Sequence, residues 1–156
     1  MPVFVNKVEI TDDEVFAEMQ YHPAENVAEA QYQAALALTI RELLCQEASR
    51  LGITPPVEQD DTELTREYLV NSLLEQEITV PTPTEEECER YYQRNPSIFR
   101  DQGGNVVPFA AVRESIAEYL QESSEQQAMK HYVKILAGQA SIAGITLERA
   151  NSPLVQ

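Results

Sequence analysis

Apolar residues recur at helical intervals along most of this chain. The spacing predicts five helices, at about residues 11–22, 25–51, 62–78, 84–95 and 109–142. The longest of them has a polar middle, residues 121–127, without an apolar face. Because a helix that is polar all round has nothing to bury, we expect this stretch to cross between two packed regions.

Several helix ends carry recognisable capping signals. Thr11 to Glu14 and Thr84 to Glu87 both have the capping-box pattern, which predicts a helix start at each site. Gly52 should cap the second helix in a left-handed conformation. In the last helix, Gly138 weakens the end and Gly144 is the expected cap.

The two ends of the chain predict a small sheet. Residues 3–10 alternate and are rich in β-branched side chains, which favours an extended segment. Residues 145–149 are the expected closing strand, and we expect them to pair with residues 3–8. The predicted fold is therefore mainly α, in a single domain spanning residues 1–156, with a small terminal β pairing.

The net charge of the chain makes some classes of binding partner unfavourable. The chain of 156 residues has a formal net charge of -15, and 43% of its residues are hydrophobic. That balance is typical of a globular protein, but it disfavours nucleic acid and anionic membranes as partners. The N-terminus has no apolar stretch of signal-peptide type, so the cytoplasm is the expected location.

The sequence offers no catalytic or metal-binding pattern. His22 and His131 are far apart, and no His-x-x-x-His pair or glycine-rich phosphate loop occurs. Cys45 and Cys88 fall within expected helices, where small, partly buried thiols are the simplest interpretation. The acids at 85–87 are typical of a helix N-terminus. We therefore predict no catalytic residue, no metal and no cofactor.

One stretch is more distinctive than the rest. It reads Ile78-Thr-Val-Pro-Thr-Pro-Thr-Glu-Glu-Glu-Cys-Glu-Arg-Tyr-Tyr-Gln-Arg-Asn-Pro-Ser-Ile-Phe99. This segment resembles the one just before the parvulin domain in SurA-like and NifM-like parvulin-type peptidyl-prolyl isomerases and chaperones. Residues 34–44 resemble the long N-terminal helix of the NifM-like branch, and residues 107–120 resemble the helix that follows the parvulin domain. The ending at residues 136–145 fits the NifM-like branch too. The resemblance implies a five-helix core like the N-terminal domain of SurA, with a helical part at 1–99, a loop at 100–107 and a C-terminal helix and strand at 108–156.

The parvulin domain itself is absent between Phe99 and Val107, where the family carries about a hundred residues. The isomerase site lies in that domain, so no catalytic residue can be carried over and this chain is not expected to be an enzyme. Natural loss of the domain and its removal from a longer isomerase both fit the sequence.

The resemblance implies an ATP-independent, chaperone-like module that binds unfolded or immature client proteins. The NifM-like branch adds a metalloenzyme component, the nitrogenase iron protein, as a client class. The candidate client-binding residues are Tyr91, Tyr92, Phe99 and Tyr119; ordinary packing is the other interpretation of each.

Two alternatives stay open. One is an assembly module, such as a homodimer formed through the long helix, without general chaperone activity. The other is an enzyme whose site would show as a pocket with clustered ionisable groups.

Overall fold

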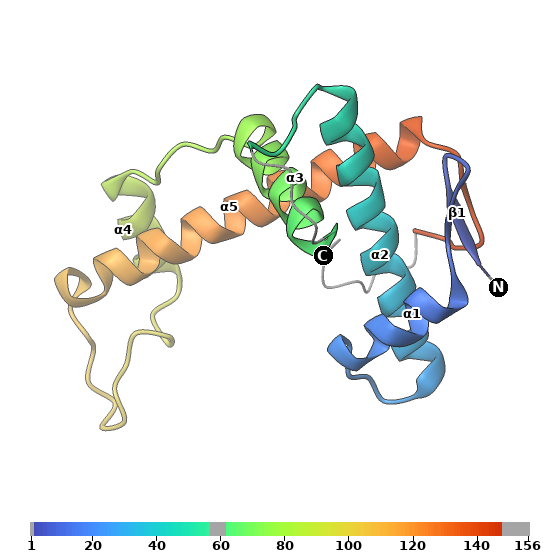
Figure 1. The fold of residues 1–156 in the computed structure, drawn as a ribbon. Coiled ribbons are helices and arrows are strands. Elements are labelled where there is room, and N and C mark those ends of the chain that lie inside the picture. Colours follow the sequence, from blue (N-terminus) through green and yellow to red (C-terminus); the bar gives the residue numbers. More distant parts are fainter. Residues whose placement is uncertain (1, 57–61, 148–156) are drawn as a thin grey trace. The chain divides into compact units, whose positions relative to one another are not determined.

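The computed structural model describes residues 2–56 and 62–147 and is mainly helical (Figure 1). The elements follow in the order β1 (Val3–Val5), β2 (Val8–Ile10), α1 (Asp12–Glu18), the short 3-10 helix η1 (Met19–Tyr21), α2 (Val27–Arg50), α3 (Thr62–Glu77), α4 (Glu85–Arg94), α5 (Phe109–Gln139) and β3 (Ile142–Ala143). Contacts group the described residues into two compact units. The first unit holds residues 2–56, 62–77 and 129–147, and the second holds residues 78–128.

The predicted helices are present, and the capping signals at Thr11, Thr84 and Gly52 work as expected. The Thr11 hydroxyl accepts a hydrogen bond from the Glu14 amide at 3.2 Å, and the Thr84 hydroxyl accepts one from Glu87 at 3.1 Å. Gly52, with a φ of 81°, ends α2 as predicted. Side-chain caps of this kind satisfy backbone amides that have no partner inside the helix.

The end of α5 differs from the prediction. The helix stops at Gln139 rather than near residue 142, and Gly144 does not cap it. Gly144 instead follows β3, with a φ of 90°, and a Cβ there would lie 2.5 Å from the carbonyl oxygen of Pro2. A glycine is needed here because the chain passes against the N-terminal strand, not because a helix ends.

The sheet has the strand order β2-β1-β3, and both pairings are antiparallel (Figure 1). We expected one extended segment at residues 3–10, but these residues form a hairpin. Its turn residues, Asn6 and Lys7, both have positive φ. The two chain ends do pair, but through β3 at Ile142–Ala143. No strand covers residues 145–147, and residues 148–149 of the expected strand lie outside the described residues.

The core of the first unit joins α2, α3 and the end of α5. Leu36, Leu44 and Leu73 are at most 2% exposed, and Val133 and Leu136 of α5 pack with them. A second apolar cluster connects β1, β2, α1 and α2. The last turns of α5 therefore share one hydrophobic core with the N-terminal helices.

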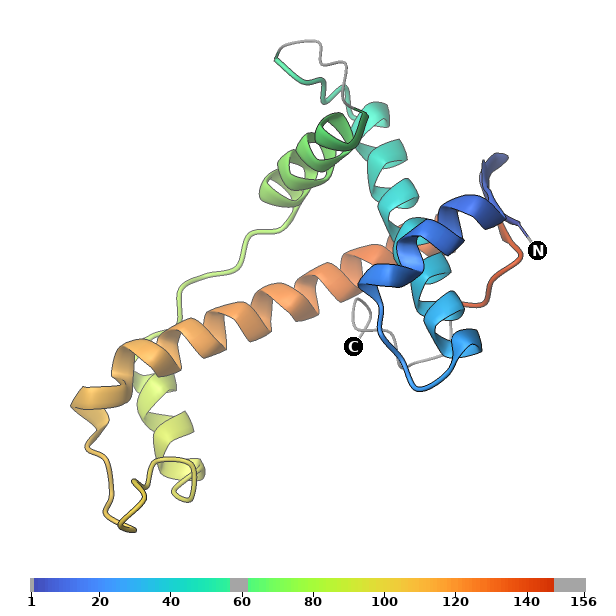
Figure 2. The same ribbon diagram turned by 60° about the horizontal axis from the view of Figure 1, so that its bottom comes forward.

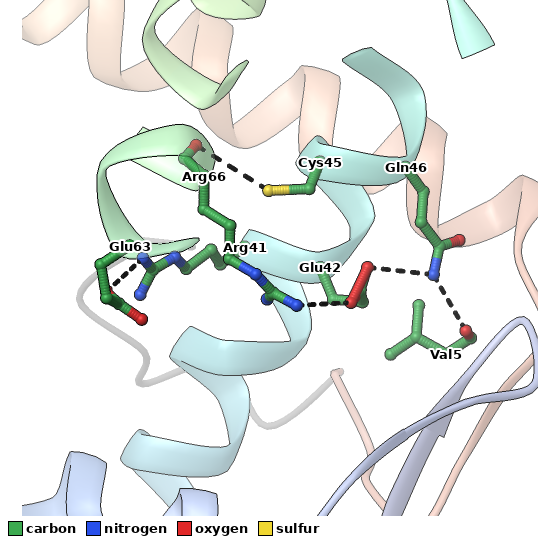
Figure 3. Close-up of polar contacts among 7 residues, drawn as sticks. All are labelled: Val5, Arg41, Glu42, Cys45, Gln46, Glu63 and Arg66. Carbon is green, nitrogen blue, oxygen red and sulfur yellow. Dashed lines mark hydrogen bonds and ion pairs between the residues drawn. The ribbon is translucent and has the colours of Figure 1, made fainter. Parts of the chain in front are cut away.

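A polar network reinforces this core on one side of α2 (Figure 3). Glu42, which is 7% exposed, accepts a hydrogen bond from Gln46 at 3.2 Å and lies 3.6 Å from the Arg66 guanidinium of α3. Gln46 also donates to the carbonyl oxygen of Val5 at 3.1 Å. A buried carboxylate needs such partners, and these link α2 to both α3 and β1.

The second unit packs α4 against the first turns of α5, and Figures 1 and 2 show the two helices side by side. Cys88 and Ile116 are its buried residues, at 2% and 3% exposure. Arg113 pairs with Glu85 at 3.0 Å on the surface. Among the described residues, no helix is long and apolar enough to span a membrane.

Candidate functional site

Five aromatic side chains gather in the second unit, and we call them the aromatic cluster: Tyr91, Tyr92, Phe99, Phe109 and Tyr119. The ring centroids of Tyr92 and Phe99 are 5.0 Å apart, and those of Tyr91 and Tyr119 are 5.4 Å apart. Such distances and the tilted or edge-on ring angles are favourable for aromatic pairs. All four residues predicted from the sequence therefore lie in one place.

Helices α4 and α5 position these rings. Tyr91 and Tyr92 come from the last turn of α4, and Tyr119 comes from α5. The Tyr92 hydroxyl donates a hydrogen bond to the carbonyl oxygen of Val107 at 2.6 Å. The side-chain amide of Asn95 donates to the carbonyl oxygen of Tyr91 at 2.8 Å, which holds the end of the helix. The Tyr92–Val107 bond therefore joins the end of α4 to the chain that enters α5.

The aromatic cluster is only partly buried. Tyr119 is 48% exposed, and the other four rings are half-buried. The flanking Ile98 and Val106 are each 59% exposed. Partial burial raises the pKa of Tyr91, and the nearby Tyr119 adds to that rise. The surface around the cluster thus presents apolar and aromatic groups that a further apolar chain can cover.

A short closed loop lies directly beside the cluster. The Val107 amide donates a hydrogen bond to the carbonyl oxygen of Phe99 at 2.8 Å. Within the loop, the Asp101 carboxylate accepts from the amides of Gly103 and Asn105, both at 2.9 Å. The two ends of the loop therefore meet at one point, which we call the Phe99–Val107 junction.

Phe109 is the member of the cluster that was not predicted from the sequence as a site residue. It is the first residue of α5, and its ring centroid lies 5.5 Å from that of Tyr92. Helical periodicity does not show where a residue at the first position of a helix points. Its place directly after the helix-starting Pro108, near four other aromatic residues, was the available signal.

Within residues 2–56 and 62–147, the remaining candidate groups do not converge on another site. Cys45 and Cys88 are buried in different units, as small thiols were expected to be. Burial raises the pKa of Cys45, which favours its protonated thiol over the reactive thiolate. His22 is held by Glu18 at 2.8 Å. No three His, Cys, Asp or Glu side chains in the described ranges converge on a metal position.

Comparisons with protein-family models, with curated proteins and with solved structures give no match to this chain. The geometry of the aromatic cluster and the resemblance carried by segments such as residues 78–99 therefore have to support any functional conclusion.

Proposed function

We propose that this protein is an ATP-independent, chaperone-like module that binds unfolded or immature client proteins. In this proposal it is the non-catalytic core of a SurA/NifM-like parvulin-type foldase, with the isomerase domain absent. The observation that carries the proposal is the position of Phe99. Its ring belongs to the partly exposed aromatic cluster, and its carbonyl oxygen closes the Phe99–Val107 junction.

The junction supports the architectural half of the proposal. Residues 100–106 replace about a hundred residues of the family's inserted domain. An insertion of that kind needs attachment points that are close together, so that the host unit folds with or without it. The 2.8 Å hydrogen bond between the Val107 amide and the Phe99 carbonyl supplies such a pair of attachment points.

The packing of the first unit also supports the architectural half of the proposal. The family resemblance implies a module in which the N-terminal helices pack with the helix that follows the isomerase domain. Val133 and Leu136, late in α5, share a core with Leu36 and Leu44 of α2. Strand β3 then pairs with β1. The SurA-like fold itself is part of the proposal.

Client binding would rest on burial of side chains against the aromatic cluster. Covering apolar surface contributes about 25 cal/mol per Å² removed from water. Aromatic rings offer large contact areas at a small cost in side-chain entropy, and they bind many apolar sequences without strict selection. The net charge of -15 then keeps the loaded complex soluble. No step of this mechanism needs a nucleotide or a metal.

The client class follows from the resemblance. Unfolded or immature proteins are the general class, and a metalloenzyme component is the specific class associated with the NifM-like branch. The aromatic cluster does not distinguish between the two, because its contacts would be with apolar side chains that both classes expose.

Fluorescence anisotropy of a labelled, permanently unfolded protein tests the proposal. Titration with this chain should give saturable binding without added nucleotide, and the same label on the folded form of the test protein should not bind. Absence of binding to the unfolded form, at protein concentrations up to the solubility limit, would refute it.

An assembly module without general chaperone activity is the second candidate, and one observation favours it. Phe16, Tyr21 and Val27 are 77%, 69% and 71% exposed in the first unit, and such residues are often covered by a second copy. Sedimentation velocity over a wide concentration range decides between the two. A stable dimer with no affinity for unfolded chains would favour assembly.

A further inference from the structure

A cavity of about 750 Å³ opens in the first unit, lined by segments that are far apart in the sequence. Ile40 of α2 and Val133 of α5 form part of its wall, and Ile142 and Ile145 come from the segment after α5. Cavities of roughly 300–1,000 Å³ with mainly apolar walls are typical of small-molecule sites. This one has the size and the apolar lining of such a site.

One face of α5 supplies a large part of the wall. Residues 130, 133, 134, 137 and 138 line the cavity, and this spacing puts them on a single stripe of the helix. The stripe combines apolar groups with two cations, because positions 130 and 134 are lysines. Lys130 is half-buried and Lys134 is exposed.

The charge at this cavity is opposite to that of the chain as a whole. Asp and Glu make up 26 of the 156 residues, yet residues 126–147 contain neither. Lys130 and Lys134 are two of the three lysines in the chain. Neither makes an ion pair with another residue in the part of the chain that the structure describes. The cavity therefore has two cations available for an anionic ligand.

Gly138 leaves room at the same wall. A glycine inside a helix is unfavourable relative to alanine, so it usually has a packing reason. Here a Cβ would have no neighbouring atom within 4 Å, so close packing does not require the glycine. The open space beside it belongs to the cavity.

From these observations we infer that the cavity binds a small amphipathic anion, an apolar chain ending in a carboxylate. The apolar chain lies against Ile40, Val133 and Ile142, and the carboxylate pairs with Lys130 and Lys134. This site lies in the first unit and does not depend on client binding by the aromatic cluster, so either proposal can fail without the other.

Isothermal titration calorimetry of the full chain with dodecanoate, below the concentration at which it forms micelles, tests this inference. The expected result is one saturable site, with dodecanol binding at least tenfold more weakly because it lacks the charge. The double variant Lys130→Gln/Lys134→Gln should weaken dodecanoate at least tenfold and leave dodecanol unchanged. Lys7→Gln removes the third lysine, which does not line the cavity, and should change neither affinity.

Gly138→Leu provides an independent variant, because it fills the cavity while improving helix propensity. It should weaken both probes and leave the thermal midpoint unchanged or raised. The inference would be overturned by non-saturable binding or by equal affinity for dodecanol. It would also be overturned if the affinity for dodecanoate were unchanged in both the lysine and the Gly138→Leu variants. An apolar peptide that binds at this cavity when dodecanoate does not would overturn it as well.

Discussion

The amide of Val107 and the carbonyl oxygen of Phe99 are joined by a 2.8 Å hydrogen bond, although residues 100–106 lie between them in the chain. Inside this closure, Arg100 and Val106 form an isolated antiparallel bridge, and the Asp101 carboxylate organises the turn. Because the loop is closed at its base, the length of the loop should have little effect on the stability of the unit that carries it.

A long insertion at the Phe99–Val107 junction should therefore be tolerated. Loop closure costs roughly 0.6 kcal/mol for each doubling of loop length. Adding glycine and serine residues between Gly103 and Gly104, to four times the present loop length, should lower the free energy of unfolding by only about 1 kcal/mol. Urea denaturation followed by circular dichroism measures the change.

The matched control places the same insertion between Arg90 and Tyr91, within α4. There it interrupts a helix and separates the aromatic cluster from its hydrogen bonds, so the second unit should unfold. Equal losses of stability for the two insertions would show that the junction is not a tolerant site.

Two glycines near the end of the chain should respond to alanine in opposite ways. Gly144→Ala forces a side chain into a positive-φ position and against the Pro2 carbonyl, and should cost about 1–3 kcal/mol of stability. Gly138→Ala meets no atom within 4 Å and should add up to about 1 kcal/mol through helix propensity. Thermal melts of both variants measure the difference; a stabilising Gly144→Ala would contradict the close approach of the two chain ends.

These glycines also show what sequence patterns can and cannot predict. Local signals were sufficient for most of the fold: apolar spacing placed α2 to α5, and Thr11, Thr84 and Gly52 marked helix ends that the structure confirms. Gly144 was misassigned because its conformation depends on Pro2, which is distant in sequence but adjacent in space.

Dependence on residues that are distant in sequence also explains why the sheet was predicted incompletely. Pairing between the chain ends was predicted, but its position was wrong, since Ile142 and Ala143 are too short a run to be recognised as a strand. Their pairing depends on Asn6, whose amide donates to the Ser141 carbonyl at 2.7 Å while its side-chain oxygen accepts from the Ser141 amide at 2.8 Å. Such reciprocal contacts between distant residues leave no periodic trace in the sequence.

For the candidate site, residue types could be chosen from the sequence, but their grouping in space could not be predicted from it. Tyr91, Tyr92 and Phe99 could be selected as aromatic residues near Asn95-Pro96, and Tyr119 as an aromatic residue of the long helix. The cavity with Lys130 and Lys134 was missed, because its wall combines α2 with the segment after α5, and only the fold brings them together.

Tyr132 offers a prediction that depends on pH. Its hydroxyl is buried and has no hydrogen-bond partner in the described part of the chain, and burial, followed by Glu47 and Glu77, raises its pKa to about 12. Because the unfolded tyrosine ionises near pH 10, the folded state retains its proton to higher pH. The contribution of Tyr132 to stability is therefore constant below pH 10, and stability is lost through this group as the pH rises from 10 toward 12.

The Tyr132→Phe variant should be neutral or more stable by roughly 1 kcal/mol near pH 7, because it removes an unsatisfied polar group. It should also lose less stability than the original protein between pH 10 and pH 12. Urea denaturation at pH 7, 10 and 11.5 provides both comparisons. A large loss of stability at pH 7 would mean that the hydroxyl has a partner after all.

Aggregation of a chemically unfolded test protein, followed by light scattering, tests the central claim of client binding most directly. The chain should suppress scattering at near-stoichiometric ratios without nucleotide, and an equally acidic folded protein should not. Tyr119→Ser, at a ring 48% exposed, should weaken suppression several-fold, while the same change at Tyr21, 69% exposed and outside the aromatic cluster, should have no effect. No suppression by the unmodified chain, or equal suppression by both variants and the unmodified chain, would contradict client binding at the aromatic cluster.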